Sequence, residues 1–520
     1  MKKKWMKMVS VLLACCMMVS ALAGCGSSST DTESGSSSSD SEEIVELAVL
    51  FPILGSAPDD LDEVEEAVNE ITESEIGVHI TFVTASLSDA ESEVTRMAAA
   101  GEQMDVLYAL GVSSYINAGL VTPLNDLLDE YGEDIKEVLG GLLDAYQISG
   151  ETYRLYSNSR YAEQYGVNFR TDILEKYGLS LDEGEYLTYE ILDEWFATIK
   201  EGEGSSFYMF AMNGTSQVTS FASNLGAMTA VDTLGSDIYT GVFTDYDTDD
   251  YTIQNLFETE AFEEYQYWMN RWYEAGYVHP DAATITDSGQ ELMLTGNYLG
   301  YIGGAGIGMA EENTTNLGFD ITTYLFEDST CIVSAQYTNG WCISSTSENQ
   351  EAAMKFLNLM YTNQDLINLI AIGIEGEHYV LTDDEGIVTY PDGVDASTVT
   401  YTGPIAVGVG DGSLQYRFAP YTSEILAELQ EFNDEVVSLT SDTYDFNVSK
   451  AFGYVFDQTN VKSECSALSD VLTEYAGAIL YGTQDPDTLI SELNDALYAA
   501  GLSTVLEENQ SQLDAWLAEQ

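Results

Sequence analysis

Basic side chains are scarce in this 520-residue chain: 16 Lys and Arg face 88 Asp and Glu, a formal net charge of −72 at pH 7. Such a charge repels the phosphates of nucleic acids and anionic lipid headgroups, so it excludes nucleic-acid binding and disfavours direct adhesion to membranes. Apolar residues are plentiful, since 45% of the chain is hydrophobic and 11% is aromatic. We therefore expect a folded body with an acidic surface rather than a disordered chain.

Cysteine is also scarce, with six residues in all, three of them within the first 25 positions. The remaining three are Cys331, Cys342 and Cys465. An odd number cannot form a complete disulfide framework, and no Cys/His spacing typical of a metal site occurs. We expect buried free thiols, with a Cys331–Cys342 bridge as the alternative.

Sequence motifs for catalysis are missing. There is no Walker A, HExxH or GxSxG pattern. Two glycine clusters, at 303–310 and 408–415, lack the third glycine of a dinucleotide-binding fingerprint and carry Met309 and Ser413 instead. The acidic stretch at 245–251 begins like an EF-hand, but Asp250 replaces its glycine and Leu256 its bidentate glutamate. We predict no catalytic residue, metal or cofactor, although 88 acids leave open the paired carboxylates of a glycoside hydrolase.

The first 43 residues predict a signal peptide followed by a flexible tether. A basic start and an apolar run ending in small residues are typical of a signal peptide, and the run has no stop-transfer flank. The Leu-Ala-Gly-Cys stretch that ends at Cys25 resembles a bacterial lipobox, which implies cleavage after residue 24 and acylation of Cys25, including palmitate. Residues 26–43 contain no aliphatic or aromatic side chain and cannot pack. We therefore predict a signal peptide at 1–24 and a lipidated, disordered tether at 25–43, which hold the protein on the outer side of the cell membrane.

Local patterns after the tether predict an α/β fold. Strands are expected at 44–51, 77–83 and 104–110, with helices at 58–77 and 88–101, the second starting from a capping box of Ser88 and Glu91. This order implies a parallel sheet, in which ligands sit beyond the carboxyl ends of the strands. Tyr108 and Ser113 lie at the end of the third strand.

Helical periodicity recurs downstream. In the stretch 259–278, Tyr265, Trp268 and Trp272 fall on one helical face. We expect that face to pack on a sheet, with a sugar-stacking platform as the alternative. Three further amphipathic helices are expected at 461–480, 486–502 and 508–520.

Several longer stretches together resemble the extracellular solute-binding lipoproteins of bacterial carbohydrate ABC importers. They are residues 105–132, 150–179, 273–284 and 340–381, together with the lipobox and the C-terminal end. One departure is Arg154-Leu155, where the family has Gly-x-Pro after the residue that matches Tyr153.

The resemblance implies a two-lobed, periplasmic-binding-protein-like α/β fold of type II, with a ligand cleft between lobes joined by crossover strands. We expect lobe 1 at 44–162 and 338–400, lobe 2 at 163–337, and a C-terminal helical region at 401–520 that packs on both lobes. About 475 residues after the tether are too many for one core.

The same resemblance, with position along the chain, selects the site candidates. Arg160 is expected to donate to sugar hydroxyls or to form a surface salt bridge. Trp341, where the chain returns to lobe 1, is expected to stack on a sugar ring or to pack in the core. Glu375 and His378 are expected to fix their glycine-rich loop or to contact the ligand. The full set of ligand-binding candidates is Tyr108, Ser113, Asn158, Arg160, Tyr165, Trp341, Glu375 and His378.

The function implied is capture of a sugar or oligosaccharide outside the cell and its delivery to the transmembrane permease subunits of an ABC importer. The resemblance implies a monomer and a neutral carbohydrate ligand. A peptide- or polyamine-binding lipoprotein remains an alternative, because negative charge attracts cations. A lipid-anchored glycoside hydrolase is the alternative among enzymes.

The lipobox generates the first prediction. Cys25→Ala removes the atom that would carry the lipid, so the protein should enter the medium or remain unprocessed while its body still folds. Partition between water and detergent measures this, with Cys15→Ala in the leader as the control. A Cys25→Ala protein that enters detergent as the wild type does would disprove the lipid assignment.

Overall fold

The structure is a computed structural model that describes residues 44–518 with internal gaps. The gaps are 54–55, 87–88, 110–111, 146, 149, 158–160, 183, 212–230, 235–240, 244–249, 286, 288, 333–339, 404–407 and 438–446. The predicted signal peptide, Cys25 and tether therefore lie outside the described residues. None of the described helices is long and apolar enough to cross a membrane.

The first sheet contains the strands that the sequence predicted. Its order is β2-β1-β3-β8, formed by β1 (Val45–Ile53), β2 (Val78–Ser86), β3 (Val106–Ala109) and β8 (Gly340–Ile343). β1 is parallel to β2 and β3, whereas β8 is antiparallel to β3. Helices α1 (Leu61–Ile76) and α2 (Ala90–Ala100) connect the parallel strands, which confirms the β-α-β-α-β prediction. The predicted capping position is wrong, because α2 begins one residue later and its N-cap is Asp89.

The second sheet has five strands in the order β12-β7-β4-β6-β5. They are β4 (Glu163–Arg170), β5 (Tyr208–Phe210), β6 (Tyr298–Gly304), β7 (Ile321–Ile332) and β12 (Asn447–Val448). β4 is central and antiparallel to both β6 and β7. A small third sheet joins β9 (Val380–Leu381), β10 (Ile387–Thr389) and β11 (Arg417–Phe418).

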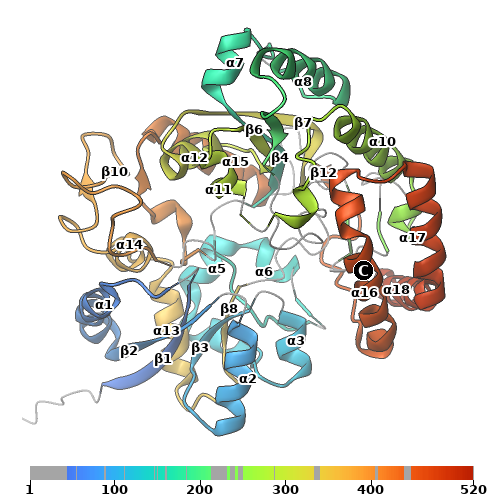
Figure 1. The fold of residues 1–520 in the computed structure, drawn as a ribbon. Coiled ribbons are helices and arrows are strands. Elements are labelled where there is room, and N and C mark those ends of the chain that lie inside the picture. Colours follow the sequence, from blue (N-terminus) through green and yellow to red (C-terminus); the bar gives the residue numbers. More distant parts are fainter. Residues whose placement is uncertain are drawn as a thin grey trace, which may run out of the picture. The chain divides into compact units, whose positions relative to one another are not determined.

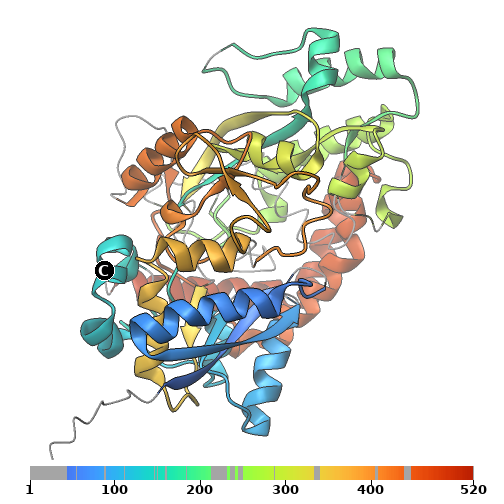
Figure 2. The same cartoon turned by 90° about the vertical axis from the view of Figure 1, so that its left-hand side faces the viewer.

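Helices make up much of the remaining described chain (Figures 1 and 2). Those in the first half are α3 (Val112–Asn117), α4 (Asn125–Tyr131), α5 (Glu133–Leu139), α6 (Gly141–Ala145), α7 (Thr171–Tyr177), α8 (Tyr189–Glu203), η1 (Leu256–Glu258) and α10 (Glu260–Glu274). Those that follow are η2 (Ala282–Thr284), α11 (Gly289–Leu294), α12 (Met309–Leu317), α13 (Gln350–Leu359), α14 (Gln364–Ile372), η3 (Gly412–Leu414), α15 (Ser423–Val437), η4 (Thr459–Val461), α16 (Lys462–Tyr481), α17 (Pro486–Ala500) and α18 (Leu502–Leu517). The last three correspond to the three predicted C-terminal helices.

Each large sheet has a hydrophobic core of its own. The core of the first sheet draws its buried residues from 47–155 and 341–409, and that of the second sheet from 167–326 and 451–513. A smaller third cluster consists of Leu142, Tyr161, Ala162, Leu429, Phe432 and Val436. Two cores make two lobes, each assembled from separate stretches of chain. The predicted lobe boundaries themselves remain a prediction.

The aromatic face of α10 packs as predicted. Tyr265 and Trp272 are fully buried in the second core. Trp268 is partly buried, and its ring lies parallel to that of Tyr189, with 5.6 Å between the ring centres. Packing therefore accounts for this face.

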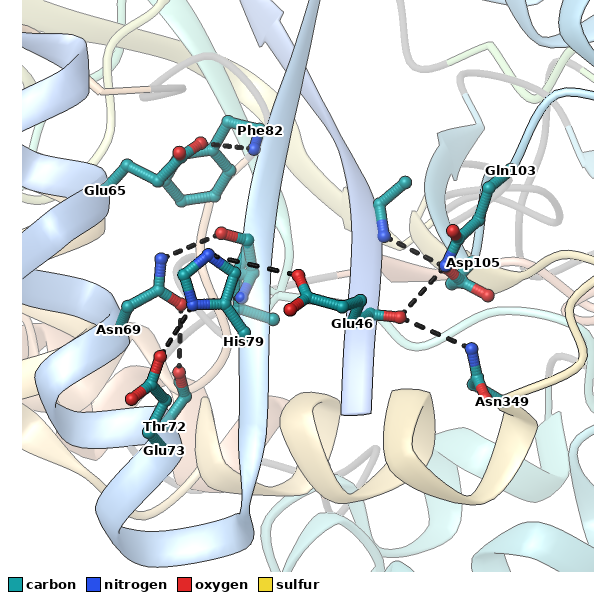
Figure 3. A network of polar contacts seen from close by, with 12 residues as sticks. Glu46, Glu65, Asn69, Thr72, Glu73, His79, Phe82, Gln103, Asp105 and Asn349 are labelled. Atoms are coloured by element: carbon teal, nitrogen blue, oxygen red, sulfur yellow. Dashed lines mark hydrogen bonds and ion pairs between the residues drawn. The ribbon is translucent and has the colours of Figure 1, made fainter. Parts of the chain in front are cut away.

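Side chains of α1 protect the outer edge of β2, the edge strand of the first sheet (Figure 3). Asn69 accepts a hydrogen bond from the Ile80 backbone N–H at 2.6 Å and donates to the Ile80 carbonyl at 2.8 Å. Glu65 accepts from the Phe82 backbone N–H at 2.5 Å. These bonds satisfy backbone groups that would otherwise be free to pair with another strand.

Asp105 links the first sheet to the segment that follows β8 (Figure 3). Its buried carboxylate accepts hydrogen bonds from the Ala48 N–H of β1 at 2.9 Å and from Gln103 at 2.7 Å. The hydroxyl of Ser347, just after β8, donates to the other carboxylate oxygen. One carboxylate thus links β1 to the segment that follows β8.

The Asn69 contacts generate a stability prediction. Asn69→Ala leaves both Ile80 backbone groups without their partner, so the free energy of unfolding should fall by about 1–3 kcal/mol. Urea denaturation followed by circular dichroism measures the loss. Glu70→Ala, one residue further along α1 and exposed, is the matched control and should change little. Equal midpoints for the two variants would contradict the edge-capping role.

Candidate ligand-binding site

Two of the predicted candidates, Tyr108 and Trp341, lie side by side. β3 and β8 pair in antiparallel register with Tyr108 opposite Trp341, so both side chains share one face of the sheet. Their rings meet edge to face at 74°, with centres 5.2 Å apart. Each residue is only 3% exposed.

Trp341 also connects three separate stretches of chain. Its backbone exchanges two hydrogen bonds with Leu155, of 2.9 and 2.8 Å, and its indole N–H donates to the Gly408 carbonyl at 3.3 Å. Leu155 precedes the first predicted crossover and belongs to the first core. The buried residues of the second core begin at Val167. These are the contacts of a core residue, which favours the packing role. A contact between Trp341 and a ligand remains a prediction.

Polar atoms accumulate next to this aromatic pair. The Ser157 hydroxyl is buried and has no hydrogen-bond partner within the described part of the chain. Gly408 takes a left-handed conformation, with φ of 70°, and a Cβ there would lie 2.8 Å from the Ser157 Cβ. This close approach requires glycine at position 408.

A buried acid and a buried tyrosine follow in the same neighbourhood. Asp411 accepts a hydrogen bond from the Ser413 backbone N–H at 3.0 Å, and burial raises the pKa of its carboxyl group. Tyr361 donates its hydroxyl to the Tyr156 carbonyl. Burial, together with the nearby Asp411 charge, raises the pKa of Tyr361 well above its ordinary value. The group can offer carboxylate and hydroxyl oxygens to a polar ligand.

Sequence reasoning missed Ser157, Tyr361 and Asp411. A signal existed for one of them, since an aspartate two residues before a serine, as in Asp411-Gly412-Ser413, is typical of a capped turn. The glycines at 408–415 indicate at most an incomplete dinucleotide fingerprint. No local pattern brings Ser157 near residue 408.

The His378 loop is fixed from within. The buried His378 ring accepts the Ile374 backbone N–H at Nδ1 over 2.9 Å, which leaves Nε2 to donate to Asp60 at 3.2 Å. Hydrogen bonds from Thr400 and then His378 lower the pKa of Asp60. Glu375 is exposed. His378 therefore has the loop-fixing role, and ligand contact by Glu375 remains a prediction.

Of the other candidates, Tyr165 belongs to a different core. Tyr165 on β4 pairs with Gly304 of β6 and packs against the second core, whereas Tyr108 and Trp341 belong to the first. Ser113 lies in α3. Asn158 and Arg160 lie outside the described residues.

Two of the three cysteines after the tether are free thiols. Cys342 and Cys465 are both buried and unbridged, which confirms the free-thiol prediction for them and makes the Cys331–Cys342 alternative wrong. Burial raises the pKa of Cys342 to about 12 and that of Cys465 to about 11, so both stay protonated at neutral pH. Within the described ranges, no three or more His, Cys, Asp or Glu side chains gather as a metal site would require.

The chain is similar to known solute-binding proteins in both sequence and fold. Over almost its full length, the chain is 25% identical to a carbohydrate ABC transporter substrate-binding protein of Streptococcus pneumoniae serotype 4, covering 99% of each chain. It also resembles the crystal structure of the N-glycan transport solute-binding protein NgtS from S. pneumoniae, with a TM-score of 0.75, 23% identity and coverage of 92% and 99% of the two chains. The complex of that protein with Man1GlcNAc gives a TM-score of 0.71 at 23% identity, with 91% and 99% covered.

Two family models match the chain. Residues 450–518 match a domain of unknown function, DUF3502. Residues 57–366 match the bacterial extracellular solute-binding protein model. The latter covers more than half of the chain, and the structural matches confirm the predicted two-lobed α/β fold. The chain therefore belongs to the bacterial extracellular solute-binding protein family.

Proposed function

We propose that this protein captures a neutral oligosaccharide outside the cell and delivers it to the membrane permease of an ABC importer. The observation that carries the proposal is the similarity over 99% of both chains to a carbohydrate ABC transporter substrate-binding protein. The fold match adds support, because NgtS was crystallised with Man1GlcNAc and with Man5GlcNAc.

The charge of the chain favours a neutral ligand. With 88 acidic and 16 basic side chains, the surface repels polyanions at a distance, and few guanidinium or ammonium groups are available to neutralise them. Neutral sugar hydroxyls need no such partner, because they donate hydrogen bonds to carboxylates and accept them from hydroxyl and amide groups. The buried oxygens of Ser157 and Asp411 are of this kind.

The proposed function requires the protein to bind and release its ligand, and no catalysed reaction. Its relatives in the comparisons are binding proteins, and the protein as proposed acts as a monomer without a catalytic residue. Attachment follows from the lipobox: a lipid on Cys25 and the flexible stretch up to residue 43 would keep the body near the permease at the outer face of the membrane. A polyamine or a peptide is the ligand class that the same charge would attract instead.

Ligand-induced stabilisation tests the proposal. Neutral mannose- and N-acetylglucosamine-containing oligosaccharides should raise the melting temperature, since a ligand that binds only the native state stabilises it by mass action. Calorimetric titration then gives the affinity. Heparin is the polyanion control and should produce no shift.

The other ligand classes give distinct outcomes in the same assay. Stabilisation by spermidine or by a mixed peptide pool, with none by neutral sugars, would overturn the carbohydrate assignment. Release of reducing ends from the oligosaccharides on incubation would overturn the purely binding role.

Trp341 generates a separate prediction. Because its ring is 3% exposed and packs on Tyr108, Trp341→Ala should lower the free energy of unfolding by about 3–5 kcal/mol. Trp341→Phe keeps an aromatic ring but loses the indole bond to Gly408, so the loss should be smaller. Thermal melts and calorimetric titration of both variants separate stability from affinity. An Ala variant of normal stability whose affinity falls tenfold or more would show that the ring serves the ligand and not the core.

A further inference from the structure

We propose that residues 450–518, which match a domain model of unknown function, act as an internal brace that orders residues 231–234, 241–243 and 250–258 of the second lobe. Helices α16 and α17 lie beside α10, and α18 packs on α16 and α17 (Figure 1). The brace, as named here, is the chain from residue 450 to 518, and the braced segment is the described part of 231–258. The inference does not depend on the identity of the ligand.

The brace is part of the second core rather than an independent domain. Its buried side chains pack in the same cluster as β4, α8 and α10. They include Leu468, Leu472, Leu480, Leu489, Leu493, Leu497, Val505 and Leu513. Gly482 lies so close to α10 that a Cβ there would come within 2.3 Å of the Met269 backbone. Without the brace, the side of α10 around Met269 would be exposed to water.

The braced segment has little regular structure of its own. Within its described residues, the only helix is the single turn η1, and the strand-like contacts are two isolated bridges, Asp232 with Phe243 and Val242 with Gln254. Backbone N–H and C=O groups that lack a helix or sheet ladder need partners elsewhere. The brace supplies several of them through side chains.

Gln510 of α18 makes the first of these contacts. Its carboxamide oxygen accepts the Ile253 backbone N–H at 2.8 Å, and its nitrogen donates to the Tyr251 carbonyl at 3.1 Å. One side chain thus satisfies a donor and an acceptor two residues apart. The two bonds fix both the position and the direction of that stretch.

Asn494 of α17 makes the second contact, further along the segment. It accepts from the Asn255 side chain at 2.8 Å and donates to the Phe257 carbonyl at 2.9 Å. Asn255 in turn accepts the Phe257 backbone N–H at 3.2 Å and so caps η1. Asn494 and Asn255 are more than nine-tenths buried, at 9% and 6% exposure. Loss of either partner would leave a buried amide unsatisfied.

The start of the segment is tied to the brace as well. The Phe456 backbone N–H donates to the Leu234 carbonyl at 3.2 Å. Leu234 is fully buried and has a φ of 53°, a left-handed conformation that is strained for leucine. Such strain persists only where surrounding contacts hold it, and here those contacts include the brace.

The chemistry of these contacts suits so acidic a chain. The brace reaches the segment mainly through the neutral amides of Gln510 and Asn494, and Tyr498 adds one hydrogen bond to the Glu258 carboxylate at 2.9 Å. Neutral amides do not repel the surrounding carboxylates, and they neither titrate nor lose strength through salt screening. The brace should therefore hold equally well across ordinary changes of pH and ionic strength.

Hydrogen exchange in the full-length protein tests the brace. Gln510→Ala and Asn494→Ala should speed amide exchange in peptides covering 250–258 by about tenfold or more, because each removes two bonds to this stretch. Peptides from β1 and β2 in the first lobe should be unchanged. Glu507→Ala, an exposed position one turn before Gln510 on α18, is the matched control and should behave as wild type.

The outcomes that overturn the proposal are equally specific. Unchanged exchange at 250–258 in both variants would show that the segment orders itself. Faster exchange spread evenly over both lobes would show a general loss of stability instead of a local brace. Gln510 is only half-buried, so its variant carries the test if Asn494→Ala fails to fold.

Discussion

Two backbone hydrogen bonds between Leu155 and Trp341 hold the outgoing and the returning passes of the chain side by side. The chain between them forms the second sheet except β12, so most of that sheet is an excursion from the first core. The antiparallel pairing of β8 with β3 makes the return possible, and Asp105 secures it through Ser347. This junction completes the first core after the chain has left it to form most of the second.

Charge sets the second constraint on the fold. Ion pairs such as Arg96 with Glu93 and Glu102 lie on the surface, where their contribution to stability is small. The contacts that position buried backbone come instead from neutral or hydrogen-bonded groups, such as Asn69 at the edge of β2 and Asn494 in the brace. A chain with so many acids can pack densely only where carboxylates are kept out or are fully bonded, as Asp105 is.

The sequence predicted the features that depend on local interactions and missed those that depend on contacts between distant stretches of chain. The first three strands and their helices were predictable because their patterns are local. The resemblance placed Trp341 near the return of the chain, and the structure brings it against Tyr108. The proximity of Ser157 to Gly408 could not be predicted, because it depends on the packing of stretches about 250 residues apart. The burial of His378 could not be predicted either, since its partner Asp60, the N-cap residue of α1, lies 318 residues earlier in the sequence.

Each core contains two stretches that are far apart in sequence, which affects how the protein is made. A ribosome that has synthesised residue 332 has supplied all of the second sheet except β12, yet the helices that pack on α10 still lie ahead, within 451–513. Until they emerge, the apolar residues of the half-built lobe have no partner and must be shielded from water or from other chains. Pairing across such sequence distances is also slow, because the long loop must close before its contacts form. Because these helices are synthesised last, the second lobe cannot complete its fold before nearly the whole chain has been made.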